Sequence, residues 1–343
     1  MRSPPRLLVA AVALCAFGFS PPGRADEPFL KPNDVIAFIG GEDMVVASEL
    51  GYLELLLTRA MPDHKLRFRC LAWEGDTVFE QRRDLNYPTL EQQLERIGAT
   101  FVIARFGQME SMNGEGKFRE FITAYEKLGR RVGGNGKRRI ALQGPHVPLA
   151  PGRATMPAWY LQGVAEVISL LPNVHGIGGY GGLESKDGKD LSTRDGYHLN
   201  ETGHWLHARS CLIGIKIDAP WFFDSEDQRA FQKTLRDQAL SPEGIATDPL
   251  PRLLELERAH EAELRRELEP LRQLIVQKNR LWFQYSRPQN WAFLAGDRTN
   301  QPSSRDHLDP KKRWFPAELE QFVPLIEAKE REIDALAAQL AKP

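Results

Sequence analysis

DVIAFIGG, residues 34–41, is the stretch that decides the expected fold of this 343-residue chain. It is an unbroken apolar run closed by two glycines, and four comparable runs follow it. They are KLRFRCLAW (65–73), TFVIARFG (100–107), RRIALQGP (138–145) and NVHGIGGYG (173–181). Continuous apolar runs are typical of parallel strands that are covered on both faces. The five runs therefore predict a parallel five-stranded sheet.

Helical patterns lie between and after these runs, at about 45–60, 90–97, 115–131, 157–171 and 201–215. The alternation of strands and helices predicts a three-layer α/β domain over residues 26–216. Ligands of such sheets bind beyond the carboxyl ends of the strands, so the residues after each run matter most. Those segments are GGED (40–43), EGDT (74–77), GQMES (107–111), HVP (146–148) and, after a Gly-rich loop, DGYHLN (195–200).

Residues 217–343 differ in pattern and predict a helical extension. Leu or Ile recurs every three or four positions over about 250–285, which indicates a long amphipathic helix that Pro270 could kink or divide. A second helix is expected at about 317–341, so the simplest arrangement is a helical hairpin. The connection between them is long and rich in proline, and its aromatic residues favour packing over disorder.

The N-terminus has the pattern of a secretory signal. Arg2 and Arg6 precede the apolar run 7–19, and Gly23-Arg24-Ala25 provides small residues for cleavage before Asp26. We therefore expect residues 1–25 to be removed and the protein to be exported, to a periplasmic or extracellular location. Cys70 and Cys211 remain, as a disulfide or, as we favour, two buried thiols.

Composition limits the classes of partner. The chain has 45 Lys and Arg against 46 Asp and Glu, so no basic face suggests nucleic acid. No apolar run after the N-terminus approaches the roughly 20 residues that span a bilayer. GGYGG (178–182) lacks the strand and helix context of a dinucleotide site, and His204 and His207 have no nearby Cys. We expect no cofactor, no metal and a small-molecule partner.

The segment DGYHLNETGH (195–204) completes a pattern. The order and spacing of the polar segments over about residues 33–215 resemble the SGNH/GDSL-type hydrolases, which are ester hydrolases with a flavodoxin-like sheet. The family is named for Ser, Gly, Asn and His in four sequence blocks. The C-terminal helices also resemble an extension found in some bacterial secreted members. The resemblance implies an esterase, or a carbohydrate acetyl-esterase.

Two of the four blocks are present. The last block is Asp195 and His198: the resemblance implies that His198 is the general base and that Asp195 orients its imidazole. Alternatively, Asp195 only caps the next helix. The second block is Gly75, which would donate a backbone N–H to an oxyanion; alternatively, it is a turn glycine before a helix capped by Asp76 or Thr77.

The other two blocks depart from the family pattern. Glu42 follows Gly41 at the position of the nucleophilic serine, and Met109 replaces the asparagine whose amide supports the oxyanion. Loss of one such donor typically costs about 100–1000-fold in turnover. Neighbouring Gln108 could substitute, and Glu110 could order the loop by accepting backbone N–H bonds. The candidate substrate-binding set is Gly41, Gly75, Gln108, Met109 and Glu110.

The nucleophile therefore stays open. Ser48, the nearest hydroxyl, lies about 9 Å along the predicted helix and is expected to pack. Glu42 could attack directly, activate water together with His198, or act with Glu110 or Asp195 as a carboxylate pair on a glycosidic bond. An ion pair with Glu42 would favour the protonated form of His198, and the imidazolium cannot act as a base at neutral pH. We carry two hypotheses: an atypical ester hydrolase, and a non-catalytic binding or scaffold protein on the same fold.

Overall fold

The computed structural model describes residues 29–83, 86–147, 155–172, 174–177, 191–215, 217, 250–288 and 291–341. Its sheet contains five parallel strands in the order β2-β1-β3-β4-β5. They are β1 (Val35–Gly40), β2 (Arg67–Cys70), β3 (Phe101–Arg105), β4 (Arg139–Gln143) and β5 (Val174–Ile177). The predicted parallel α/β sheet is confirmed, in the strand order of flavodoxin-like folds. The predicted signal and the segment 178–182 lie outside the described residues.

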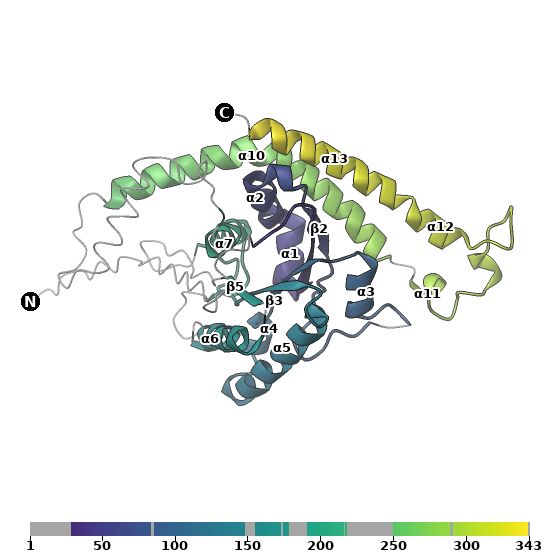
Figure 1. The fold of residues 1–343 in the computed structure, drawn as a ribbon, viewed down its shortest axis with the longest axis horizontal. Coiled ribbons are helices and arrows are strands. Elements are labelled where there is room, and N and C mark those ends of the chain that lie inside the picture. The colour runs from purple at the N-terminus through teal and green to yellow at the C-terminus, as the bar shows by residue number, and fades with distance from the viewer. Residues whose placement is uncertain are drawn as a thin grey trace, which may run out of the picture.

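Helices cover both faces of the sheet (Figure 1). One face carries α1 (Glu42–Leu50), α2 (Tyr52–Ala60) and α7 (Glu201–Gly214). The other carries α3 (Leu90–Arg96), α5 (Phe118–Gly133) and α6 (Thr155–Leu170). Short turns complete the domain: η1 (Pro62–His64), α4 (Gln108–Ser111) and η2 (Glu115–Lys117). The three-layer prediction is confirmed.

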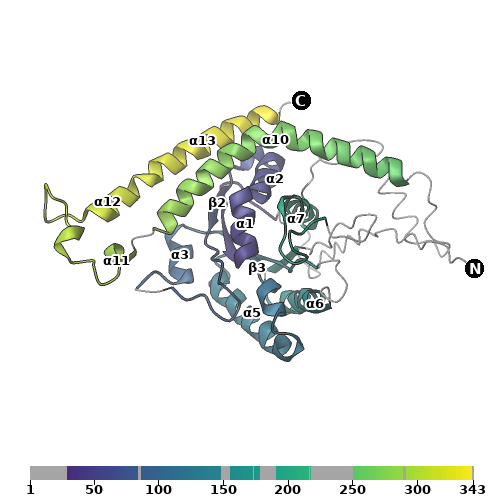
Figure 2. The same cartoon turned by 180° about the vertical axis from the view of Figure 1, so that it is seen from behind.

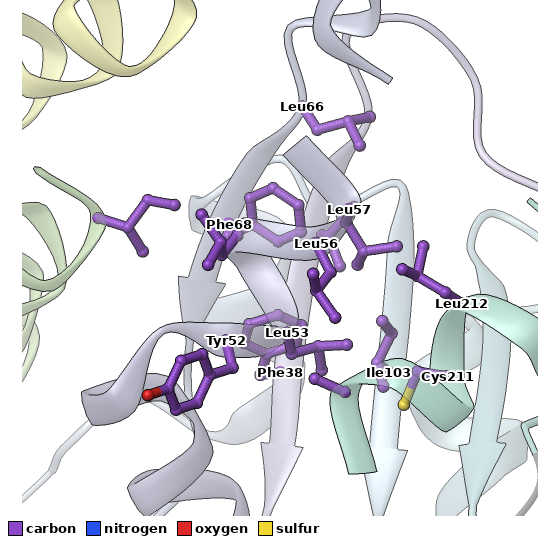
Figure 3. Close-up of a cluster of buried hydrophobic side chains, with 14 of the residues drawn as sticks. Phe38, Tyr52, Leu53, Leu56, Leu57, Leu66, Phe68, Ile103, Cys211 and Leu212 are labelled. Atoms are coloured by element: carbon purple, nitrogen blue, oxygen red, sulfur yellow. The ribbon is translucent and has the colours of Figure 1, made fainter. Parts of the chain in front are cut away.

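The alternation of side chains along β1 divides the core into two clusters. Ile36 and Phe38 point into the cluster under α1, α2 and α7, whereas Ala37 and Ile39 point into the cluster under α3, α5 and α6. Successive residues of a strand face opposite sides, so an apolar run can supply both cores. Figure 3 shows Phe38 beside Leu53 of α2 in the first cluster.

The helix expected at 45–60 is two helices. Gly51 interrupts it with φ 75°, a left-handed conformation that glycine adopts without steric cost. A Cβ at this position would also lie 3.0 Å from Cγ2 of Ile275. The break therefore allows α10 to approach the domain closely.

The C-terminal prediction holds, with one correction. α10 (Leu250–Ser286) runs unbroken through Pro270, but the helix expected at 317–341 is divided at Gln321 into α12 (Trp314–Glu320) and α13 (Phe322–Leu340). α10 and α13 lie side by side as a hairpin in both views (Figures 1 and 2). Their connection contains α11 (Trp291–Leu294) and η3 (Pro302–Ser304). None of the helices described is long and apolar enough to cross a bilayer.

The extension covers the edge strand β2. Lys278 Nζ donates to the carbonyl of Phe68 at 3.3 Å, and Trp282 Nε1 donates to that of Cys70 at 2.8 Å. One turn of α10 separates the two donors, and the two acceptors are alternate residues of the strand. An open sheet edge is otherwise a template for pairing with another chain. α10 therefore closes this edge with side-chain donors.

Cys70 and Cys211 are free thiols, which agrees with the favoured alternative. Cys70 is half-buried at the end of β2. Cys211 is buried in α7, where the Gln143 amide nitrogen contacts its sulfur and burial raises the pKa of the thiol to about 12. Neither cysteine is poised as a nucleophile, because the thiolate is the reactive form.

Candidate functional site

The polar segments converge on a small cavity at the carboxyl ends of β1, β2 and β3. Its volume is about 20 Å³, which accommodates about one water molecule. The lining residues are Gly41, Glu42, Asp43, Asp76, Arg105, Phe106, Gln108, Met109, Glu110 and His198. Segments that are far apart in the sequence thus meet at one place, as parallel topology requires.

A tight loop carries His198 to the cavity. Thr193 and Leu199 form an antiparallel bridge, and the Arg194 N–H donates to the His198 carbonyl at 2.9 Å. Gly196 turns the chain with φ 79° and donates its N–H to Thr193 Oγ1 at 3.1 Å. The loop ends where Asn200 Oδ1 accepts the Gly203 N–H at 3.0 Å and so caps α7.

Asp195 and His198 form the expected dyad. Nδ1 of His198 lies 2.6 Å from Asp195 Oδ2, while Asp195 Oδ1 accepts the N–H groups of Tyr197 and His198 at 2.9 and 2.8 Å. Burial alone would raise the pKa of Asp195, but the His198 side chain and these two N–H donors outweigh it and lower the pKa to about 2. Asp195 is therefore ionised at neutral pH, and it holds the imidazole so that Nε2 faces the cavity.

Glu42 is the first residue of α1 and faces the other side of this imidazole. Its Oε2 lies 3.6 Å from His198 Nε2, and its Oε1 lies 2.6 Å from an Arg194 nitrogen. A carboxylate is favoured at this helix N-terminus by the dipole. Arg194 was missed in the sequence analysis, because a basic residue in a loop has no local signal beyond its closeness to Asp195.

The β3–α4 turn is ordered by Glu110. Gly107 has φ 113°, and its N–H donates to Glu110 Oε2 at 2.8 Å, while the Val78 N–H donates to Oε1 at 2.7 Å. Burial raises the pKa of Glu110, and the N–H donors oppose that rise. The structure thus gives Glu110 the loop-ordering role that was expected of it.

Gln108 and Met109 behave differently at the cavity. Gln108 is buried and donates from Nε2 to the Tyr197 carbonyl at 3.0 Å, so it joins α4 to the His198 loop. The Tyr197 hydroxyl makes a second contact between α4 and this loop, with Ser111 Oγ at 2.9 Å. Burial raises the pKa of Tyr197 to about 12. Met109 is exposed and brings no donor.

Gly75 lies on an exposed loop beside the cavity and is not part of its lining. A Cβ there would meet no atom within 4 Å. The neighbouring Asp76 lines the cavity and pairs with Arg83 through contacts of 2.6 and 2.7 Å. No helix begins there, so the capping alternative is wrong: the next helix, α3, is capped by Thr89. The oxyanion role of Gly75 stays a prediction.

A buried polar layer lies beneath the cavity. Arg105 pairs with Asp43 at 3.1 Å, and Gln143 Nε2 lies 3.1 Å from His207 Nδ1. Burial lowers the pKa of His207, and burial followed by the charge of Arg105 lowers that of His204 to about 4, so both stay neutral near pH 7. The described residues contain no group of three or more potential metal ligands. Arg105 was also missed, although a charge in an apolar strand is a visible signal.

Comparison with known proteins gives the following relations. No family model and no curated protein matches the sequence. Among solved structures, the fold is similar to a family two carbohydrate esterase from Clostridium thermocellum (18% identity, 55% of this chain and 64% of that chain, TM-score 0.37). It is also similar to a gut microbial diltiazem-metabolizing enzyme (11% identity, 91% of this chain and 95% of that chain, TM-score 0.49). A third similar structure is that of a psychrotrophic esterase from Pseudoalteromonas sp. (17% identity, 53% of this chain and 96% of that chain, TM-score 0.39).

This chain therefore spans a little under two thirds of the first of these structures. Identities and TM-scores this low assign no activity to the chain. What the site can do chemically therefore follows from the geometry of this chain's own residues.

Proposed function

We propose that this protein is an ester hydrolase in which water, rather than a serine hydroxyl, attacks the substrate. The observation that carries the proposal is the line Asp195–His198–Glu42 at the mouth of a cavity of water size. The 3.6 Å between His198 Nε2 and Glu42 Oε2 exceeds a hydrogen bond, so a small molecule can be held by both atoms.

In the proposed reaction, His198 Nε2 accepts a proton from water as the oxygen attacks the ester carbonyl carbon. Asp195 stabilises the resulting imidazolium. His198 then returns the proton to the leaving alkoxide, which gives one acid and one alcohol. Glu42 orients the attacking water by accepting its second hydrogen. General base catalysis of this kind contributes about 100–10,000-fold.

Weak stabilisation of the oxyanion limits this site. Met109 offers no donor at the position where the similar family has an amide. We therefore expect slow turnover, and acetyl esters, including those of carbohydrates, are the first substrates to test.

The second candidate is a non-catalytic binding or scaffold protein. The contact that favours this candidate is the ion pair between Arg194 and Glu42 at 2.6 Å. It places a carboxylate whose charge is balanced by arginine at the position where a nucleophile would act. Fold alone does not choose between the candidates.

Hydrolysis of p-nitrophenyl acetate by purified protein separates them. We expect His198→Ala to abolish turnover and Asp195→Asn to lower it by about 100-fold or more, because the imidazole loses its orientation. His307→Ala is the matched control, since His307 is exposed in the connection between α11 and α12. It should leave turnover unchanged.

The variant Glu42→Ser probes the nucleophile position directly. If the parent protein is inactive and Glu42→Ser gains turnover together with labelling by a fluorophosphonate, the esterase proposal is wrong and the fold is a scaffold. A parent whose activity disappears only in the His198 and Asp195 variants supports the proposal.

A further inference from the structure

A second cavity lies between the domain and its C-terminal extension. It has a volume of about 380 Å³, within the range of about 300–1,000 Å³ of small-molecule sites. One wall is α1, with Val45 and Ser48, and the opposite wall is α10, with Val276, Trp282 and Phe283.

The second cavity lies further along α1 than the candidate catalytic site. Glu42 lines the first cavity, whereas Val45 and Glu49 line the second. Positions three and seven residues apart on a helix share one face, and one turn rises about 5.4 Å. A molecule held at Glu42 can therefore extend along this face towards α10.

An ion pair also links the surroundings of the two cavities. Arg287, which lines the second cavity, pairs with Glu74 at 2.9 Å. Glu74 belongs to the loop that places Asp76 in the first cavity, and its carbonyl lies 3.8 Å from a Cβ built on Gly41. The loop that lines the first cavity thus contacts a side chain that lines the second.

The interior of the second cavity suits an apolar group. Two polar side chains of its lining are engaged in hydrogen bonds: Asn279 Nδ2 donates to the Ser48 carbonyl at 2.8 Å, and Trp282 Nε1 donates to the Cys70 carbonyl at 2.8 Å. The charged side chains of Glu49 and Arg280 are exposed at its mouth. The apolar part of the lining consists of two valines and two aromatic side chains, Val45, Val276, Trp282 and Phe283.

We propose that the second cavity is an acyl-chain subsite, so that the preferred substrate is an ester of an unbranched apolar acid longer than acetate. This inference rests on the proposed function, since an acyl chain enters only if its carbonyl lies at Glu42 and His198. It gives the C-terminal extension a direct part in substrate selection.

The test compares p-nitrophenyl hexanoate with p-nitrophenyl acetate. Each buried methylene favours binding by about fourfold, so we expect a kcat/KM ratio of about ten or more in favour of hexanoate. Val276→Phe fills the cavity and should bring the ratio of kcat/KM for hexanoate to that for acetate close to one. Phe283→Ala, at a side chain that is 42% exposed, should lower the ratio several-fold without a folding defect. Leu325→Ala, which is 51% exposed on α13, is the matched control and should retain the parent ratio.

Binding of 1-hexanol, followed by saturation-transfer NMR, makes the two failures distinguishable. If the parent protein hydrolyses neither ester, the proposed function is wrong. If that parent nevertheless gives a 1-hexanol signal that Val276→Phe loses, an apolar binding site is supported. Equal kcat/KM ratios in all variants, with 1-hexanol signals that do not differ among them, would overturn the acyl-chain subsite.

Discussion

Glu42 sets the charge balance of the candidate site. It stands between Arg194 and His198, so one carboxylate faces two groups that can carry positive charge. A serine hydroxyl at this position would instead receive its activation from the imidazole. Under the proposed function, the carboxylate at this position orients water and forms no covalent intermediate.

Asp195→Asn is expected to lower stability near neutral pH and to matter less in acid. Folding lowers the pKa of Asp195 from 3.8 to about 2, so its stabilisation is present above pH 3.8 and is lost as pH falls through 2. Its side chain is 48% exposed, and solvent screening limits the contribution to about 1 kcal/mol. Urea unfolding of the parent and of Asp195→Asn at neutral and acid pH measures the difference in their free energies of unfolding. A difference that is larger in acid than at neutral pH would contradict the prediction.

His204 predicts a second pH dependence. Burial and the charge of Arg105 lower its pKa from 6.5 to about 4. Between these two pKa values only the unfolded chain binds the proton. The free energy of unfolding is therefore unaffected by this group above pH 6.5 and decreases towards pH 4, by up to about 3 kcal/mol.

His204→Gln should therefore reduce the loss of stability between pH 7 and pH 5, without abolishing it, because His207 is also buried. Urea unfolding at the two pH values measures the slope. His307→Gln, at an exposed position, is the control and should keep the parent slope. An unchanged slope in His204→Gln would refute the assignment.

The loop 192–200 and α7 form the element that positions the dyad, and their contact is unusually close. A Cβ built on Gly203 would lie 2.1 Å from the Ser192 carbonyl oxygen. Only glycine allows this approach, which brings the loop across the start of α7 and directs His198 towards Glu42.

Gly203→Ala should consequently destabilise the protein by about 1–3 kcal/mol, since the backbone must shift to accommodate the methyl group. The same shift should lower any esterase activity through displacement of His198. Thermal unfolding and p-nitrophenyl acetate turnover report the two effects. Gly116→Ala is the control, because a Cβ there meets no atom within 4 Å, and equal behaviour of the two variants would disprove the argument.

At the scale of the whole molecule, the C-terminal extension contributes side chains to the buried clusters of the domain. Leu268 and Ile275 of α10 belong to the same buried cluster as Phe38 of the sheet and Leu53 of α2. Lys278 of α10 is fully buried and pairs with Glu54 of α2 at 2.7 Å. The extension is therefore expected to unfold together with the domain.

Lys278→Met tests this coupling. It leaves Glu54 buried without its partner, which typically costs about 3–5 kcal/mol. Replacing both residues, with Lys278→Met and Glu54→Leu, should recover much of that loss. Unfolding followed by tryptophan fluorescence and circular dichroism should give one coincident transition in the parent. Two separate transitions in the parent would show that the extension is independent.

Much of this architecture was predictable from sequence because its signals are local. Continuous apolar runs identified all five strands, and a Leu and Ile period of three to four identified α10. The breaks at Gly51 and Gln321 were missed, since each depends on what the helix packs against. Within the site, Asp195, His198, Glu42 and Glu110 were found through motif order, whereas Arg194 and Arg105 were not.

By itself the sequence determined the parallel sheet, the helical extension and the chemical identity of the groups at the strand ends, because burial on both faces and helical period are written in neighbouring residues. The tertiary structure alone decided that Arg194 neutralises Glu42, that Gly75 stands outside the cavity, and that α10 closes the edge of β2 and borders a second cavity. These are contacts between residues far apart in the chain. Their distances depend on how complete elements pack, which no local pattern encodes.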